Sequence, residues 1–300
     1  MNEKILNHYR EFGTYTYPGL YQDGLKNDLP DDVRKIGDLV RKNFIHRTTL
    51  QDGNVGTNAD LKFGDMKQVP WWRQPEDDIL TTSAAMLAEL YHRDQRGFVN
   101  DRAPKDKLVL TCRYVAIMTA SILKSKGIPA RARAGNASYF DMGSLGDIST
   151  DHWITQYWAE KENRWITIDV DGSWSLSKKF DPYDMPEGSF DFPADAWLDI
   201  RSGRVGPEHF HNAKPEKGAI VVFWSLFYDF HCLMNSEILY IYGAAGGYGS
   251  YEKFPKLTKE ELEKIDNLAH LMQKPDENFD ELVKIWETDK SLRLLAGGLL

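Results

Sequence analysis

Apolar side chains recur three and four residues apart in several stretches of the chain, which is the spacing of an amphipathic helix. The first such stretch contains Val33, Ile36, Leu39, Val40 and Phe44, and it follows Pro30-Asp31-Asp32. We expect Asp31 to cap this helix and Asp32 to favour the positive end of its dipole. Further helices are predicted over residues 77–93, 112–126, 257–273 and 277–289. Gly127 and Pro129 mark the end of the predicted helix 112–126.

Strand-like alternation of apolar and polar residues occupies 130–140, 152–158 and 164–170. The last two segments flank a short polar turn and predict a β-hairpin centred near Glu160-Lys161. The apolar run 219–234 fits a buried helix or a buried strand, and its periodicity does not separate the two. The first twenty residues predict an aromatic strap on the surface, and 50–75 a long loop.

These elements predict an α+β protein in which residues 1–255 form one principal domain, with a core at about 77–175. Residues 256–300 are predicted to form a helical extension. The chain contains 300 residues, enough for a sizeable core.

Charge and composition exclude several functional classes. The net charge is −8, which disfavours a nucleic-acid partner or an anionic membrane surface. No stretch reaches the roughly 20 apolar residues of a membrane span, and the first residues do not resemble a secretory signal. Only Cys112 and Cys232 occur, which predicts free thiols in a reducing cytoplasm. The oligomeric state stays open.

Cys112 is the first candidate for chemistry, because it begins the predicted helix 112–126. The N-terminus of a helix lowers the pKa of a thiol, and Arg113 adds positive charge. The alternative is a buried structural cysteine, which is the commoner role of a lone thiol in a cytoplasmic protein.

His152 and Asp169 are the natural partners for such a thiol. The predicted hairpin sets them close to opposite each other, so that the carboxylate orients the imidazole and leaves its other nitrogen for the thiol. Asp171, which would point to the same face, and Asp151, next to the histidine, are competing carboxylates. The alternative roles are a surface strand residue for His152 and a turn residue for Asp169.

In this arrangement the chain resembles the transglutaminase-like superfamily, whose core is papain-like. The resemblance is carried by Cys112 with Gly127-Ile128-Pro129-Ala130-Arg131, by His152-Trp153, and by Trp165 through Asp169. The tryptophan after the histidine stands one place earlier than in the family pattern.

A wider resemblance, to uncharacterised bacterial transglutaminase-like proteins, covers roughly residues 15–245. Its further elements are Pro18-Gly19-Leu20-Tyr21, Leu29-Pro30-Asp31-Asp32-Val33, Cys112-Arg113, Tyr139-Phe140, Asp151-His152-Trp153, Phe180-Asp181-Pro182 and Asp195-Ala196-Trp197. Gln156 departs from the pattern, which often has glutamate there.

The resemblance implies a Cys112-bearing helix packed on an antiparallel sheet that carries His152 and Asp169, with helical additions at both ends. It implies a hydrolase or acyltransferase that acts on an amide of a peptide-like or small-molecule substrate. A catalytically idle module that binds a partner, and a dedicated acyltransferase of small-molecule biosynthesis, are the alternatives.

The remaining candidates concern substrate and metal. The candidate substrate-binding residues are Trp71, Trp72, Arg113, Tyr139 and Trp153. Trp71, Trp72 or another side chain of the 50–75 loop is also a candidate second donor to the oxyanion. No cofactor and no metal is predicted, since the pair His209 and His211 has no third ligand pattern beside it.

Overall fold

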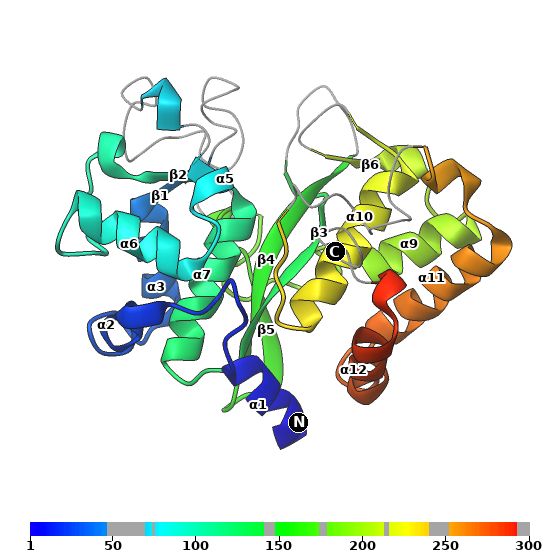
Figure 1. The fold of residues 1–300 in the computed structure, drawn as a ribbon, viewed down its shortest axis with the longest axis horizontal. Coiled ribbons are helices and arrows are strands. Elements are labelled where there is room, and N and C mark those ends of the chain that lie inside the picture. The colour runs from blue at the N-terminus through cyan, green and yellow to red at the C-terminus, as the bar shows by residue number, and fades with distance from the viewer. Residues whose placement is uncertain are drawn as a thin grey trace. The chain divides into compact units, whose positions relative to one another are not determined.

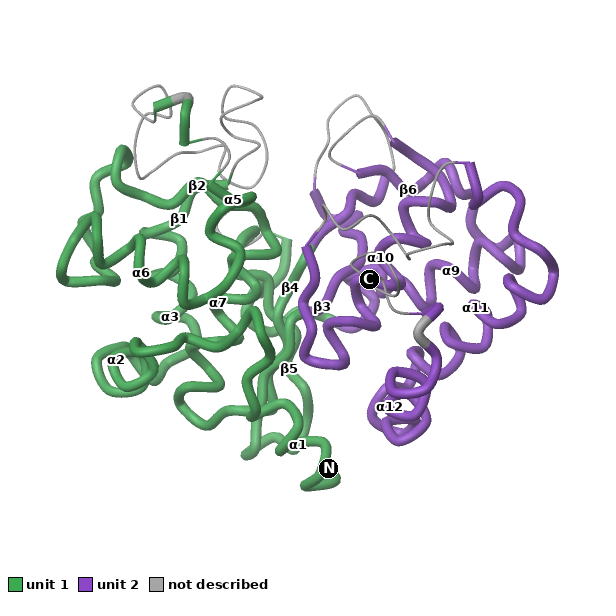
Figure 2. Tube along the Cα trace, in the orientation of Figure 1, with its two compact units in different colours: residues 1–132, 153–186 green, residues 133–152, 187–300 purple. Residues whose placement is uncertain are grey.

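The described chain forms two compact units (Figure 2). The computed structural model describes residues 1–46, 70–73, 76–140, 148–173, 179–212, 216–239 and 252–292. Unit 1 comprises Met1–Ala132 with Trp153–Pro186, and unit 2 comprises Arg133–His152 with Glu187–Leu300. The predicted division into a domain of residues 1–255 and an extension of 256–300 stays a prediction.

The described residues combine helices with an antiparallel sheet, in agreement with the predicted α+β class. The main sheet has the strand order β3-β4-β5, and β6 also pairs with β4. Its strands are β3 (Ala130–Ala137), β4 (Ser149–Ala159), β5 (Arg164–Ile168) and β6 (Phe210–His211). A separate parallel pair consists of β1 (Phe44–His46) and β2 (Leu108–Leu110).

Unit 1 is built around α7 (Cys112–Ser125), in which every residue is buried. Three helices pack on it, α2 (Gln22–Asn27), α3 (Val33–Asn43) and α6 (Ser83–Arg93) (Figure 1). The strand β4 also contacts it, since the Thr155 hydroxyl donates to the carbonyl of Ala116 at 3.2 Å. This burial on all sides explains why most of its residues are apolar, although the helix also buries the charged side chains of Arg113 and Lys124.

The end of α7 confirms the prediction from Gly127. This glycine has φ +77°, where a side chain would be strained, and its N–H donates to the carbonyl of Lys124 at 2.9 Å. The N–H of Ile128 donates to the carbonyl of Leu123 at 3.0 Å, which completes a helix-terminating turn. The chain then enters β3 through Pro129.

Three predictions in unit 1 are wrong in detail. The cap of α3 is Asp32, whose side chain accepts from the N–H of Lys35 at 2.9 Å, while Asp31 pairs with Lys126 at 2.8 Å. The predicted helix 77–93 divides into α5 (Glu76–Ile79) and α6, because the side chain of Thr82 caps a new start.

The N-terminal strap is also wrong, because residues Glu3–Arg10 form the helix α1 with Asn2 as its cap. This helix buries Ile5, Leu6 and Tyr9. The ring of Tyr9 lies edge-on to Trp165 of β5, with their centroids 5.4 Å apart.

The predicted hairpin forms, with a register two residues away from the expected one. Ala159 pairs with Arg164 and Thr155 with Ile168, so the centre falls between residues 161 and 162. The loop between the paired residues contains Asn163, which has a left-handed conformation with φ +51°. The ladder ends before it reaches His152 and Asp169.

Unit 2 consists mainly of α9 (Pro193–Ser202), α10 (Ala219–Leu233), α11 (Lys259–Met272) and α12 (Phe279–Thr288). The ambiguous apolar run is therefore a helix, and the two C-terminal helices are confirmed. α9 contacts both α10 and α11. The Trp197 indole and the Arg201 guanidinium both donate to Asp266 of α11, at 2.8 and 3.0 Å.

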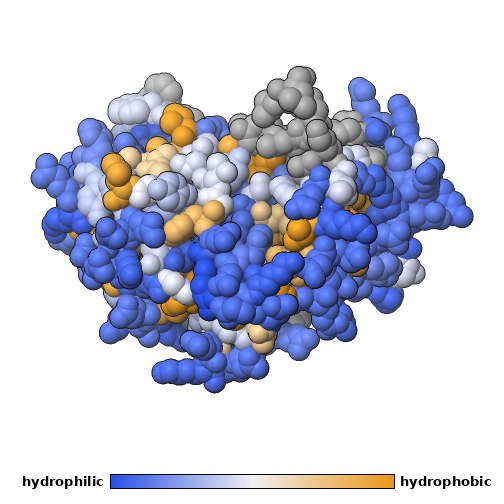
Figure 3. All heavy atoms as spheres, turned by 60° about the horizontal axis from the view of Figure 1, so that its bottom comes forward, coloured by the Kyte–Doolittle hydropathy of each residue, from blue (hydrophilic) through white to orange (hydrophobic). Residues whose placement is uncertain are grey.

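Short 3₁₀ turns complete the described chain, at Gly19–Tyr21, Trp71–Arg73, Pro104–Asp106, Pro207–His209, Phe254–Lys256 and Lys290–Leu292. Figure 3 shows a face on which hydrophilic residues dominate and hydrophobic ones form small separate areas. Within the described ranges, the helices are all too short or too polar to cross a membrane.

Candidate active site

Cys112 is the first residue of α7, as the sequence predicts, and it is 7% exposed. Thr111 is the N-cap, in an extended conformation with φ −97° and ψ 177°. Its carbonyl accepts from the N–H groups of Tyr114 and Val115 at 3.0 and 3.4 Å. The thiol therefore stands in the first turn, where N–H groups and the helix dipole favour a negative charge.

The N-cap residue of α7, Thr111, gives the N–H groups near the Cys112 thiol no acceptor from its own side chain. The Thr111 side chain makes no capping hydrogen bond, although threonine is a good cap residue. Its Oγ1 is buried and has no hydrogen-bond partner within the part of the chain that the structure describes. The side chain thus leaves the first N–H groups of the helix to other acceptors.

Arg113 and Trp153 lie together inside unit 1. The Arg113 guanidinium is fully buried and lies 4.8 Å from the ring centre of Tyr15, 4.9 Å from that of Tyr114 and 5.8 Å from that of Trp153. Such contacts stabilise a cation away from water. This burial gives Arg113 and Trp153 a packing role at the helix start, and their contact with a substrate stays a prediction.

Asp169 comes directly after β5 and is fully buried in unit 1. Its Oδ1 accepts from the N–H of Gly172 at 2.8 Å, and its own N–H donates to the carbonyl of Pro182 at 2.8 Å. These bonds fix both the backbone and one carboxylate oxygen of this residue.

Asp171, one of the competing carboxylates, is also buried and lies beside basic side chains of two other elements. Its Oδ1 accepts from Arg41 of α3 at 3.1 Å, and its Oδ2 lies 3.6 Å from the Nε2 of His46 in β1. The sequence offers no signal for this network, because Arg41 stands among polar residues of an amphipathic helix.

His152 belongs to unit 2, where it is the fourth residue of β4 and 3% exposed. Its ring lies edge-on to two aromatic rings, with centroid distances of 4.8 Å to Phe140 and 6.3 Å to Tyr139. Tyr139, a predicted substrate contact, is itself 7% exposed. Two aromatic rings of the same unit therefore pack against this imidazole.

The structure thus places Cys112 and Asp169 in unit 1 and His152 in unit 2, and all three side chains are buried. Their meeting in one triad remains a prediction. Of the two tryptophans, Trp72 is 63% exposed in the turn Trp71–Arg73. The side chain of Trp71, residues 50–69 and residues 74–75 of the predicted loop lie outside the described residues.

Gln156, where the family pattern often has glutamate, has a defined role in the sheet. Its Oε1 accepts from the Arg131 guanidinium at 2.9 Å, and its Nε2 donates to the hydroxyl of Thr167 at 3.0 Å. The amide therefore connects Arg131 of β3 with Thr167 of β5 across β4.

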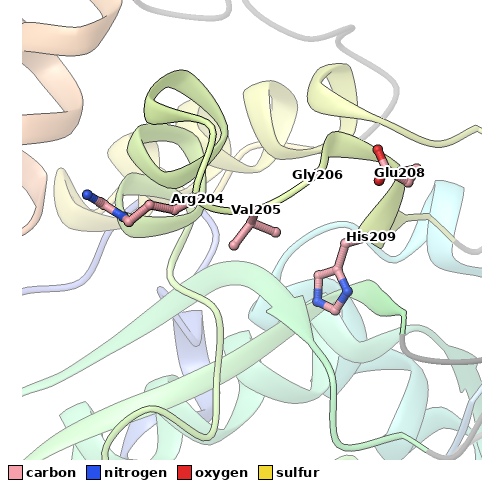
Figure 4. A pocket seen from close by; sticks show the side chains of 5 residues that line it. All are labelled: Arg204, Val205, Gly206, Glu208 and His209. Carbon is pink, nitrogen blue, oxygen red and sulfur yellow. The ribbon is translucent and has the colours of Figure 1, made fainter.

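A surface hollow of unit 2 is lined by Arg204, Val205, Gly206, Glu208 and His209 (Figure 4). All five residues come from the segment that follows α9, and Arg204 pairs with Asp199 of that helix at 2.7 Å. The described ranges contain no group of three His, Cys, Asp or Glu side chains that would hold a metal ion.

No protein-family model, curated protein or solved structure matches the chain.

Proposed function

We propose that this chain is a cysteine-dependent enzyme with a transglutaminase-like, papain-like core, which attacks an amide through Cys112, His152 and Asp169. The observation that carries the proposal is the position of Cys112, buried at the start of α7 with no side-chain cap from Thr111. A helix N-terminus of this kind stabilises a thiolate.

Two further features support the roles of the other residues. The Asp169 carboxylate is held by the Gly172 N–H through one oxygen, which suits a group that orients an imidazole. His152 is enclosed by Tyr139 and Phe140, which limits the orientations of its ring. A buried, oriented imidazole is the usual base for a thiol nucleophile.

The reaction follows from these groups. The Cys112 thiol gives its proton to His152, and the resulting thiolate adds to the carbonyl carbon of the substrate. The backbone N–H of Cys112 donates to the oxyanion that forms. The intermediate then expels the amine, which takes the proton from His152, and leaves a thioester on Cys112. Water or an amine attacks this acyl-enzyme and restores the thiol.

We favour hydrolysis over transfer to an amine, because the sequence has no feature that marks an amine-acceptor site. A product analysis separates the two outcomes. With an excess of a primary amine, a hydrolase still releases the acid, whereas an acyltransferase forms the new amide. The substrate class in this proposal is a peptide-like or small-molecule amide.

The test is the rate at which iodoacetamide alkylates Cys112 as a function of pH, followed by mass spectrometry. Cys232, which is fully buried in unit 2, is the internal control. We expect Cys112 to react well below the ordinary thiol pKa of about 8.5, and we expect His152→Ala to abolish the reaction at low pH.

The opposite result favours the alternative of an idle binding module. In that case Cys112 reacts as slowly as Cys232 at every pH, and His152→Ala leaves its rate unchanged. The comparison is made on variants whose circular dichroism matches the parent chain, so that unfolding does not expose the thiols.

A further inference from the structure

Asp171 connects the turn after β5 to two other elements of unit 1. Its carboxylate is 1% exposed, accepts from Arg41 at 3.1 Å and lies 3.6 Å from the His46 ring nitrogen. Arg41 is 2% exposed and belongs to the last turn of α3, while His46 is the last residue of β1. The carboxylate therefore links the turn to α3 through a hydrogen bond and lies beside the end of β1.

The same turn holds the Asp169 carboxylate. The N–H that Asp169 accepts belongs to Gly172, the next residue after Asp171. Ser173 closes the turn, because its hydroxyl and its N–H both donate to the carbonyl of Val170, at 2.9 and 3.4 Å. A shift of Asp171 thus moves the peptide group that fixes Asp169.

A buried ion pair is a poor way to gain stability, because taking both charges out of water costs about as much as their attraction returns. The place of this pair is more informative than its energy. The Arg41–Asp171 pair holds the residue directly before Gly172. The N–H of Gly172 in turn donates the hydrogen bond that orients the Asp169 carboxylate.

We propose that Arg41 and Asp171 are positioning residues, which fix the turn 169–173 so that the Asp169 carboxylate keeps the orientation needed by the imidazole. The inference rests on the proposed function, in which Asp169 orients His152. Neither Arg41 nor Asp171 touches the reacting atoms in this scheme.

The test compares Asp171→Asn, Arg41→Met and the conservative Arg41→Lys with Asp169→Asn. The matched control is Asp229→Asn, the same substitution in a second buried arginine–aspartate pair, which belongs to unit 2. Two readouts are needed: amide hydrogen exchange at Gly172 by NMR, and the pH profile of Cys112 alkylation.

We expect Asp171→Asn and Arg41→Met to speed exchange at Gly172 at least about tenfold, since they loosen the turn. At low pH they should slow alkylation of Cys112 by about tenfold to a hundredfold, toward the rate of Asp169→Asn. Arg41→Lys should show smaller changes than Arg41→Met in both the exchange rate at Gly172 and the alkylation rate of Cys112. Asp229→Asn should change neither rate. A purely structural role predicts that all destabilised variants share one alkylation profile.

Two failures are distinguishable. If Asp169→Asn slows alkylation while Asp171→Asn and Arg41→Met do not, the positioning role is overturned and the proposed function stands. If Asp169→Asn alkylates like the parent chain, the proposed function fails, and the positioning role fails with it whatever Gly172 does. Where one of Asp171→Asn and Arg41→Met does not fold, the other carries the comparison, and an alkylation profile identical to that of the parent overturns the inference. Where neither folds, Arg41→Lys carries it, and faster exchange at Gly172 with the alkylation profile of the parent overturns the inference.

Discussion

The ion pair between Arg133 and Asp229 gives the sharpest prediction about the stability of unit 2. Asp229, in α10, is fully buried and accepts from the Nε and Nη2 of Arg133 at 2.7 Å each. It also accepts from the N–H of Ala134 at 3.1 Å, and the guanidinium lies 4.4 Å from the ring centre of Phe192. The pair therefore fastens β3 to α10.

Replacing one partner leaves the other charge buried without its counter-ion. For Asp229→Asn we expect a loss of about 3–5 kcal/mol in the free energy of unfolding, near the lower end because the asparagine oxygen can still accept from the Arg133 Nε and the Ala134 N–H. The double variant Arg133→Met, Asp229→Leu removes both charges. It should recover most of the loss, because apolar packing replaces a buried pair at little net cost.

Urea unfolding of the parent, Arg133→Met, Asp229→Leu and the double variant forms a double-mutant cycle, and Asp229→Asn is measured beside it. The expected coupling free energy is at least about 2 kcal/mol. A loss below about 1 kcal/mol for Asp229→Asn would contradict the reasoning, since it would mean that water reaches Arg133. A double variant less stable than both singles would contradict it as well.

Three further predictions concern unit 1. Burial, with help from nearby guanidinium groups, lowers the pKa of Lys107 to about 7, so the unfolded chain holds the proton to higher pH than the folded one. The stability of the parent relative to Lys107→Met should therefore rise with pH, by about 2–3 kcal/mol between pH 7 and 9 in thermal or urea unfolding; a flat difference would refute this. Asp32→Ala should lower the free energy of unfolding by about 1 kcal/mol, because it removes the cap of α3, whereas Asp31→Ala removes only an exposed ion pair and should change it very little. Equal losses for the two variants in urea unfolding would argue against Asp32 as the cap. Gly37→Ala should cost about 1–3 kcal/mol, because the new Cβ would lie 2.6 Å from the Tyr183 ring, and an unchanged melting temperature would show that the ring has room to move.

The sequence predicts those elements best whose signals are local. Gly127 and Pro129 mark the end of α7, and the polar segment between the two strands marks the hairpin. The register of the hairpin is harder, because it depends on the length of the turn. Asn163, which takes up a left-handed conformation, is the one residue that hints at the longer loop.

Tertiary contacts decide the features that the sequence does not predict. The sequence did not predict α1, because the aromatic and Gly/Pro-rich residues that follow it favour an irregular segment. The apolar side chains of this helix are explained by a tertiary contact, the packing of Tyr9 against Trp165. Arg41 and Lys107 look like surface residues in the sequence and are buried in the structure. Their roles come from partners far along the chain, which no local pattern records.

The candidate site also contains one feature that the sequence predicts and one that it does not. The start of α7 at Cys112 follows from the pattern, because an apolar helical run begins there. The choice between Asp169 and Asp171 does not, since both follow the same strand. In the structure they have different partners: Asp169 accepts from the Gly172 N–H, and Asp171 forms a salt bridge with Arg41.

The central claim is that Cys112 is an activated nucleophile. The most direct measurement is the reaction of the chain with p-nitrophenyl acetate near pH 7, followed by mass spectrometry of the acetylated residue. We predict a burst of nitrophenolate equal to one acetyl group per chain, carried by Cys112 and lost in His152→Ala. Acetylation of surface lysines alone, with Cys112 unmodified and no burst, would contradict the account.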